Sequence, residues 1–220
     1  MTVEEAKQIA KVLRFPPANC YSVPEEYTII DLPNKENSKY LNFNLNANHF
    51  VPEYHKEVVI PKLEELLDFK VDDSFVWTIR KVNNGNSDLG FYRPVNPNDY
   101  MFSAYCITTG EEKEGNFDIL TTCVDTEPSH TDYHRVYRYP HRCSRIINLT
   151  NDTDRRLLLC GDSQLLPEIA LLACFFKEVW YLDKRYGNFS AKELFKDIEF
   201  THVLFEVGGS SFSMILNSME

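Results

Sequence analysis

Apolar and polar positions alternate most regularly in the last third of the chain. Residues 157–160 form an apolar run, a Gly-Asp-Ser turn follows, and residues 165–176 repeat apolar positions at helical spacing. Two more apolar runs lie at residues 178–183 and 202–207, with a helix-forming segment between them. Short apolar strands that alternate with helices are typical of βαβ units, in which the strands are parallel and the crossovers right-handed. The pattern therefore predicts a βαβαβ core over residues 155–207.

Two further helices are predicted outside the strands. The segment between the second and third strands favours a helix over residues 191–198, because a serine stands directly before it as an N-cap. Residues 2–15 are amphipathic, and Thr2 and Glu5 have the spacing of a capping box. An N-terminal helix within residues 1–19 is therefore expected.

The long region between these two parts has weaker patterns. Residues 20–150 mix aromatic side chains with Asn, Asp and Pro, which predicts an irregular, β-rich portion. Short β-like runs lie at residues 27–30 and 74–79. A short helix is expected over Ile60–Leu67, because Pro61 suits a first helical turn.

Composition limits the classes of partner. With 220 residues, 43% of them hydrophobic, the chain is long enough to bury a full core, and we expect a single domain over residues 1–220. The net charge of −10 argues against nucleic-acid binding and against an anionic membrane surface. The sequence has no apolar run of about eighteen residues, so we expect no membrane span.

The six cysteines indicate a reducing compartment. They lie far apart and form no Cys-x-x-Cys pair, so buried free thiols are expected rather than disulfides or a metal site. The N-terminus is acidic and lacks the pattern of a signal peptide. These features predict a cytoplasmic protein.

The Gly-Asp-Ser turn is the strongest candidate for a functional site. Ser163 follows a predicted buried strand, and ligands and nucleophiles in α/β sheets lie at the carboxyl ends of strands. Backbone N–H groups around Asp162 and Gln164, at the start of a helix, are candidate donors to an acyl oxyanion. The structural alternative is that Ser163 only caps the helix while Asp162 interacts with its positive end.

The same region resembles the C-terminal part of the DHHW family. The resemblance covers roughly residues 145–207 and rests on Arg-Leu-Leu-Leu-Cys-Gly-Asp-Ser, on the helix that carries Pro167, and on the Leu-Asp-Lys-Arg-Tyr that ends the next strand. It implies an α/β fold with an SGNH-like (flavodoxin-like) parallel sheet flanked by helices, preceded by an irregular mixed α+β portion. It also implies a relation to the acetyltransferases that decorate alginate and other bacterial polysaccharides.

A serine nucleophile needs a base, and the sequence offers one in another segment. In the DHHW family an Asp-x-His motif upstream of the serine supplies the carboxylate and the base, but its counterpart here, residues 91–100, contains neither histidine nor tryptophan. Asp132 and His134 have the same spacing, so Asp132 is expected to orient His134, which activates Ser163. The alternatives are an exposed polar loop and, less favoured, a zinc site. The other histidines near this motif, held in reserve as bases, are His130 and His141.

Further residues are candidates for the pocket and for substrate binding. Glu206 ends the third predicted strand on the same edge as Ser163, and the loop that begins at Gly208 follows it. Cationic and aromatic side chains that could hold a carbohydrate by stacking and bidentate bonds are Arg138, Tyr139, Lys184 and Arg185. The alternative for these residues is a solvated surface.

Two functions remain from different classes. The first is serine-dependent acyl-ester chemistry, by an esterase or O-acyltransferase, on a glycan or glycoconjugate. The second is a catalytically degenerate SGNH-like protein that binds a glycan or a partner protein. Neither needs a cofactor or a metal, and the expected partner is a carbohydrate or acyl-donor substrate.

Overall fold

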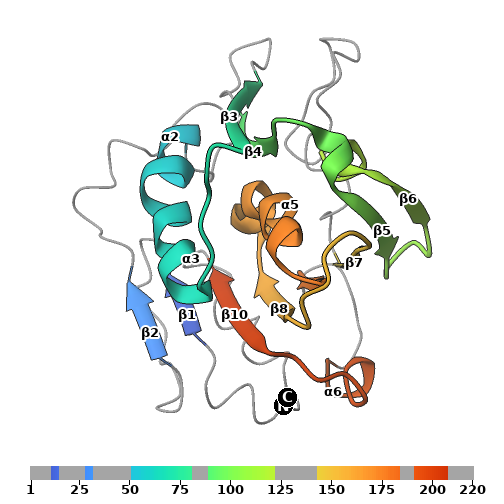
Figure 1. Ribbon diagram of the computed structural model, residues 1–220. Coiled ribbons are helices and arrows are strands. Elements are labelled where there is room, and N and C mark those ends of the chain that lie inside the picture. Colours follow the sequence, from blue (N-terminus) through green and yellow to red (C-terminus); the bar gives the residue numbers. More distant parts are fainter. Residues whose placement is uncertain are drawn as a thin grey trace.

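A mixed β-sheet of eight strands runs through the centre of the molecule (Figure 1). The computed structural model describes residues 11–14, 28–31, 51–80, 89–121, 143–183 and 191–207. Within these ranges the order of the sheet is β2-β1-β10-β8-β9-β7-β5-β6. The strands are β1 (Lys11–Arg14), β2 (Thr28–Asp31), β5 (Met101–Cys106), β6 (Glu112–Asn116), β7 (Cys143–Asn148), β8 (Arg156–Gly161), β9 (Glu178–Leu182) and β10 (His202–Val207).

The two halves of the sheet differ in strand direction. From β2 to β9, each strand is parallel to its neighbours. From β9 to β6, each pair is antiparallel. The predicted parallel pairing of β8, β9 and β10 is confirmed, but the sheet as a whole is mixed rather than parallel. A short turn with Gly110 at φ 73° joins β5 to β6, and such a turn can connect only antiparallel neighbours.

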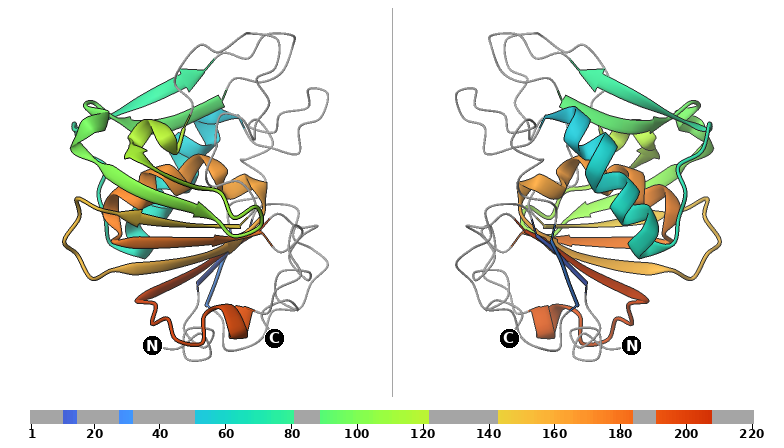
Figure 2. Two further views of the ribbon diagram at one scale, coloured as in Figure 1. Left: turned by 90° about the vertical axis from the view of Figure 1, so that its right-hand side faces the viewer. Right: turned by 90° about the vertical axis from the view of Figure 1, so that its left-hand side faces the viewer.

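A layer of helices covers one face of the sheet (Figure 2). It consists of α5 (Leu166–Phe175) and of a continuous helical run made of α2 (Pro52–Tyr54), a π-helix (His55–Val59) and α3 (Ile60–Leu67). A separate hairpin of β3 (Phe75–Arg80) and β4 (Leu89–Pro94) lies beyond α5. The short α6 (Ala191–Leu194) lies on the opposite side of the sheet.

The π-helix lies directly before a proline. The Ile60 N–H bonds to the His55 carbonyl, five residues back. Pro61 has no N–H to donate, and its ring crowds the carbonyl four residues earlier, so the helix widens there instead of breaking. The predicted helix Ile60–Leu67 is confirmed, and the widened turn extends it back to Pro52.

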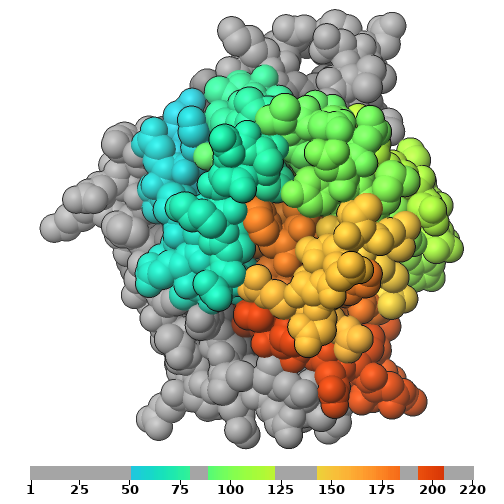
Figure 3. Space-filling model, viewed as in Figure 1, coloured from blue at the N-terminus to red at the C-terminus, as the bar shows by residue number. Residues whose placement is uncertain are grey.

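The core lies between the sheet and α5. Leu157 and Leu159 of β8 belong to one buried cluster with α5 and α3, whereas Leu158 and Cys160 are buried on the other face. On that other face the Trp180 ring meets Phe195 edge to face. Nine of the ten residues of α5 are buried, and little of the helix reaches the surface in the space-filling view (Figure 3). The continuous apolar runs of the sequence thus correspond to strands that are covered on both faces.

The prediction of an N-terminal helix is wrong where the structure describes that region. Residues 11–14 form β1, which pairs with both β2 and β10. Pairing with two distant strands outweighs the local helical pattern, as tertiary context often does. The other residues of that predicted helix lie outside the described ranges. The helix predicted over residues 191–198 is also shorter, because α6 ends at Leu194.

Other predictions for the N-terminal region are closer to the structure. The β-like runs at residues 27–30 and 74–79 correspond to β2 and β3, each displaced by one residue. The antiparallel strands β5, β6 and β7 were not predicted. In the sequence, these strands alternate only weakly between apolar and polar residues. β6 is exposed and β7 is buried at most positions, whereas β5 alternates in burial but is apolar at every position except Ser103.

Candidate functional site

Ser163 lies on a tight turn between the central strand β8 and α5. The strand ends at Gly161, and a 3₁₀ turn (Ser163–Leu165) leads directly into the helix. The Asp162 carboxylate accepts a 3.0 Å hydrogen bond from the Gln164 N–H and is the N-cap of this turn. Ser163 is half-buried, whereas Asp162 and Gln164 are buried. The cap is therefore Asp162 and not Ser163, which leaves the serine hydroxyl as the more exposed group of the turn.

The carbonyl of Asp162 anchors the turn to the neighbouring strand. It accepts hydrogen bonds from the Leu165 N–H at 3.2 Å and from the Tyr181 hydroxyl at 3.0 Å. Tyr181 belongs to β9, so this bond fixes the turn against the sheet from the side of α5. The Gln164 N–H is thus already paired within the turn, and the Gln164 side chain is buried.

A second buried carboxyl group lies at the same edge of the sheet. Asp183 directly follows β9 and is 1% exposed. Its carbonyl accepts a 3.5 Å bond from the Cys143 thiol, at the start of β7. Neither Asp183 nor Tyr181 was predicted as a site residue from the sequence. The available signal was an acidic residue directly after an apolar strand, but the register that puts it level with Gly161, at the end of β8, cannot be obtained from the sequence.

Most of the other predicted site residues are not tested by the structure. The candidates for base, carboxylate and substrate binding that lie outside the described ranges are Asp132, His134, His130, His141, Arg138, Tyr139, Lys184, Arg185 and Gly208. Glu206 is described only as part of the backbone of β10, where it pairs with Gly161 at the end of β8. This register places Glu206 at the same sheet edge as the turn.

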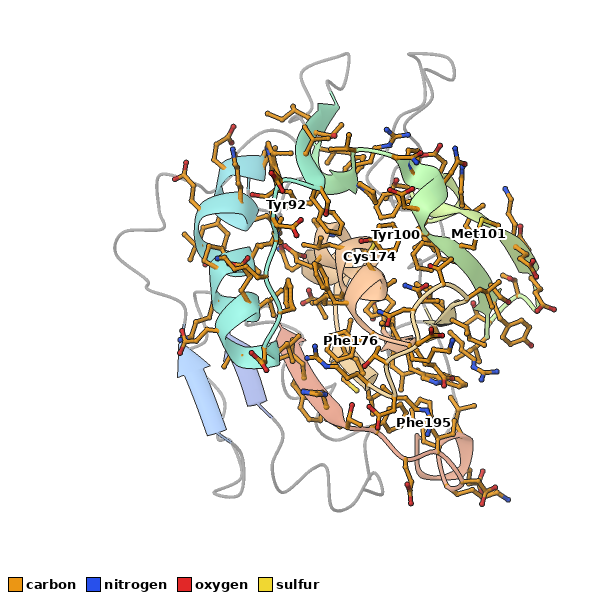
Figure 4. The ribbon with its side chains drawn as sticks, viewed as in Figure 1. Tyr92, Tyr100, Met101, Cys174, Phe176 and Phe195 are labelled. Carbon is orange, nitrogen blue, oxygen red and sulfur yellow. The ribbon has the colours of Figure 1, made fainter. Side chains whose placement is uncertain are left out.

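The counterpart of the Asp-His-His-Trp segment lies at the opposite edge. Residues 97–99 form a 3₁₀ turn whose Asn96 side chain accepts from the Asn98 N–H. β5 begins just after it, and Phe102 pairs with Asn148 at the far end of β7 from Cys143. Tyr100 lies near Cys174, at the C-terminal end of α5 (Figure 4). Ser163 is at the N-terminal end of that helix, so this segment cannot supply its base.

The core contains an acid–base pair that the sequence did not reveal. His55 Nδ1 lies 2.5 Å from Glu168 Oε1, and the two side chains are 2% and 0% exposed. His55 comes from the π-helix and Glu168 from α5. Burial lowers the pKa of His55 from 6.5 to about 3 and raises the pKa of Glu168 well above its ordinary 4.5. Both shifts favour the uncharged forms, in which the imidazole Nδ1 accepts a hydrogen bond from the protonated carboxyl group.

Two atoms of this pair have no hydrogen-bond partner among the described residues. They are His55 Nε2 and Glu168 Oε2, both fully enclosed. A substrate cannot reach groups that are so deeply buried. The pair is consequently a structural element beneath α5 rather than part of the site at Ser163.

The described part of the chain can also be examined for metal-binding groups, free thiols and membrane-spanning helices. None of its groups of His, Cys, Asp and Glu is arranged to hold a metal ion. Four cysteines within it are free thiols, namely Cys106, Cys143, Cys160 and Cys174. Its helices are all too short or too polar to cross a bilayer.

Comparison with known proteins identifies the fold. Bacillus cereus PatB1 is 16% identical, with a TM-score of 0.63 over 94% of this chain and 85% of PatB1. PatB1 with a sulfonyl adduct has a TM-score of 0.66 at 16% identity, over 95% of this chain and 84% of that chain. A DHHW family protein from Eubacterium siraeum is 17% identical, with a TM-score of 0.60 over 93% of this chain and 79% of its own.

This chain shares its fold with these proteins. No protein-family model matches the sequence. The search of curated proteins also found no match. Identities of 16–17% over nearly the whole chain show a shared architecture and leave the chemistry to be argued from the residues. The chain has the α/β fold of PatB1 and of a DHHW family protein.

Proposed function

We propose that the protein carries out serine-dependent acyl-ester chemistry, as an esterase or O-acyltransferase, on a glycan or glycoconjugate. The observation that carries this proposal is the position of Ser163. It is half-buried at the carboxyl end of the central strand, on a turn that the Asp162 cap and the Tyr181 bond hold in place. A nucleophile needs both access to substrate and a fixed orientation, and this turn provides both.

The reaction proceeds in two steps at this turn. The Ser163 oxygen attacks the acyl carbon and its proton passes to a base, for which we propose His134, oriented by Asp132. The bond from the acyl carbon to the leaving alcohol then breaks, and the base returns the proton to that alcohol. Water or a glycan hydroxyl takes the acyl group from Ser163 in the second step, with the same base accepting its proton. Arg138, Tyr139, Lys184 and Arg185 remain the proposed contacts to the sugar.

A sequence resemblance and a structural similarity support this chemistry. The SGNH-like interpretation and the relation of the DHHW family to polysaccharide acetyltransferases follow from the sequence resemblance around Ser163. Among the proteins with this fold, PatB1 forms a sulfonyl adduct. Sulfonyl and phosphonyl fluorides react with activated nucleophiles, so the same class of reagent is a direct probe for this chain.

Labelling with a fluorophosphonate tests the proposal. We expect the wild-type protein to be labelled at Ser163, as located by peptide mass spectrometry, and Ser163→Ala to remain unlabelled. Ser144→Ala is the matched control, because Ser144 is a fully buried serine on β7, which β9 separates from β8, and its hydroxyl has no partner among the described residues. This control should be labelled like the wild type. A wild type that shows no label at Ser163 would contradict an activated nucleophile.

A second function is favoured by one observation. The segment that resembles the Asp-His-His-Trp motif lacks its histidines and lies at the edge opposite Ser163. A catalytically degenerate protein that binds a glycan or a partner protein would have this arrangement. Glycan binding by calorimetry, unchanged in Ser163→Ala and combined with absent labelling, would identify this alternative.

A further inference from the structure

Two arginines meet at one carboxylate, at the edge of the sheet opposite Ser163. Glu178 is the first residue of β9, and its Oε1 lies 2.6 Å from Arg145 Nε, while its Oε2 lies 3.6 Å from Arg156 Nε. Arg156 is the first residue of β8, whereas Ser163 comes after that strand has ended. The length of β8 therefore separates this arginine cluster, made of Arg145, Arg156 and Glu178, from the proposed nucleophile.

The strand registers place the arginine cluster on one face of the sheet. Arg145 pairs with Trp180 of β9, and directly paired residues share a face. Arg156 pairs with Glu178 of the same strand. Glu178 and Trp180 are two residues apart, so they share a face as well. Because Trp180 meets Phe195, directly after α6, this is the face opposite the helical layer (Figure 2).

The carboxylate and an aromatic ring hold the guanidinium groups in place. The Glu178 side chain is only 11% exposed, and it also accepts a 2.7 Å hydrogen bond from Trp180 Nε1. The Arg145 guanidinium lies over the Trp180 ring, 5.2 Å from its centre. Arginine side chains that are already fixed lose less conformational entropy when a ligand binds. The cluster is therefore preorganised.

The terminal nitrogens of both guanidinium groups remain open to a ligand. In the part of the chain that the structure describes, Arg145 and Arg156 form side-chain ion pairs with Glu178 alone, and these pairs use the Nε atoms. The two arginine side chains are 41% and 45% exposed. The terminal nitrogens of an arginine form a planar fork that matches the oxygens of a carboxylate or a phosphate. The cluster thus presents two such forks to solvent.

Charge and shape select the kind of anion. Two guanidinium groups and one carboxylate leave one net positive charge, in a chain whose net charge is −10. The negative charge elsewhere on the chain repels a polyanion, so a single small anionic group fits this site better. One arginine fork satisfies both oxygens of a carboxylate. A phosphate group has three acceptor oxygens and can be shared between two forks.

We propose that Arg145 and Arg156 form a binding site for the phosphate group of a small phosphate monoester, with Glu178 as the residue that positions them. The terminal nitrogens of each guanidinium donate to the phosphate oxygens, while each Nε stays directed at Glu178. The site lies at the opposite edge of the sheet from the Ser163 turn. It is therefore independent of the proposed acyl-ester chemistry.

Calorimetric titration of the full chain with glucose 6-phosphate and with inorganic phosphate tests the proposal. We expect both to bind the wild type, and acetate at the same ionic strength to bind at least about tenfold more weakly. Arg145→Gln and Arg156→Gln should each weaken the binding of glucose 6-phosphate by about tenfold or more, because each removes charge-assisted hydrogen bonds. Arg145→Lys should weaken it as well, since an ammonium group keeps the charge but not the fork.

Arg93→Gln is the matched control. Arg93 is another arginine that pairs with a carboxylate, 3.0 Å from Asp118, but it belongs to the separate hairpin. Its loss changes the net charge equally and should leave phosphate binding within about twofold, because distant charges are screened by solvent and salt. Arg156→Gln keeps the test usable if Arg145→Gln does not fold, because the Arg156 contact with Glu178 is the longer one. A wild type that binds neither phosphate probe, or equal losses in Arg93→Gln and Arg156→Gln, would overturn the proposal.

Discussion

Two polar sites lie along the first turns of α5, and they differ in their access to solvent. At the start of the helix, Ser163 is half-buried on a braced turn at the sheet edge. Five residues later, Glu168 is fully enclosed with His55 at 2.5 Å. Both combine residue types that catalyse reactions, but only the first can meet a substrate. Exposure and strand position therefore separate a reactive site from a buried pair that contributes to the core.

Loss of the nucleophile or its base should have the largest effect on activity. We expect Ser163→Ala and His134→Ala each to reduce hydrolysis of p-nitrophenyl acetate by about a thousandfold or more. The double variant should be little worse than either single one, because the members of such a site act as a unit. Steady-state kinetics with matched protein concentrations measure this. Losses that multiply in the double variant would show that the two residues act independently.

Breaking the buried pair should affect stability instead. His55→Ala leaves a buried, uncharged carboxyl group without its partner, and we expect the free energy of unfolding to fall by about 1–3 kcal/mol. Replacing both residues by apolar ones, in His55→Leu with Glu168→Met, should restore most of that loss, because no unpaired polar group remains. Urea denaturation provides the values. Fluorophosphonate labelling of the folded double variant at Ser163 should persist, and its disappearance would place the pair within the reactive site after all.

The buried pair should also give stability a defined pH dependence. Between about pH 4.5 and 6.5, the folded pair and the unfolded chain bind the same number of protons, because the folded state holds a proton on Glu168 and the unfolded state holds one on His55. Above pH 6.5 the folded state binds one proton more, so stability falls as pH rises. Below pH 4.5 the unfolded state binds one more, so stability falls toward pH 3.

The apolar double variant isolates this contribution. The difference in unfolding free energy between the wild type and His55→Leu with Glu168→Met should be flat from pH 4.5 to 6.5. Outside that window the difference should change by about 1.4 kcal/mol per pH unit. The wild type should lose stability relative to the double variant both as the pH rises above 6.5 and as it falls below 4.5. Urea titrations at pH 3.5, 5.5 and 8 measure it. A difference that stays flat with pH above 6.5 would show that the folded pair holds no proton there, and hence that Glu168 is ionised in the folded protein.

The contrast between the two sites also shows what the sequence can reveal. The Ser163 turn was predictable because an apolar strand, a short polar turn and a helical repeat are local patterns within about twenty residues. The partners of the buried pair are 113 residues apart, so no local pattern connects them. Asp183 and Tyr181 depend on the register of β9 against β8, which is likewise a property of the assembled sheet. The strand β1 was missed for the same reason, since its partners β2 and β10 stabilise it.

The smallest expected effect concerns the bond that holds the Ser163 turn against the sheet. Tyr181→Phe removes the hydroxyl that donates to the Asp162 carbonyl but keeps the ring in the core. Because that carbonyl still accepts from the Leu165 N–H, we expect a loss of only about 1 kcal/mol in the free energy of unfolding. The turn should nevertheless become less well oriented, so the rate of fluorophosphonate labelling at Ser163 should fall by about tenfold or less. Tyr92→Phe in the separate hairpin is a matched control, and equal labelling rates in Tyr181→Phe and the wild type would show that the cap at Asp162 orients the serine without help from β9.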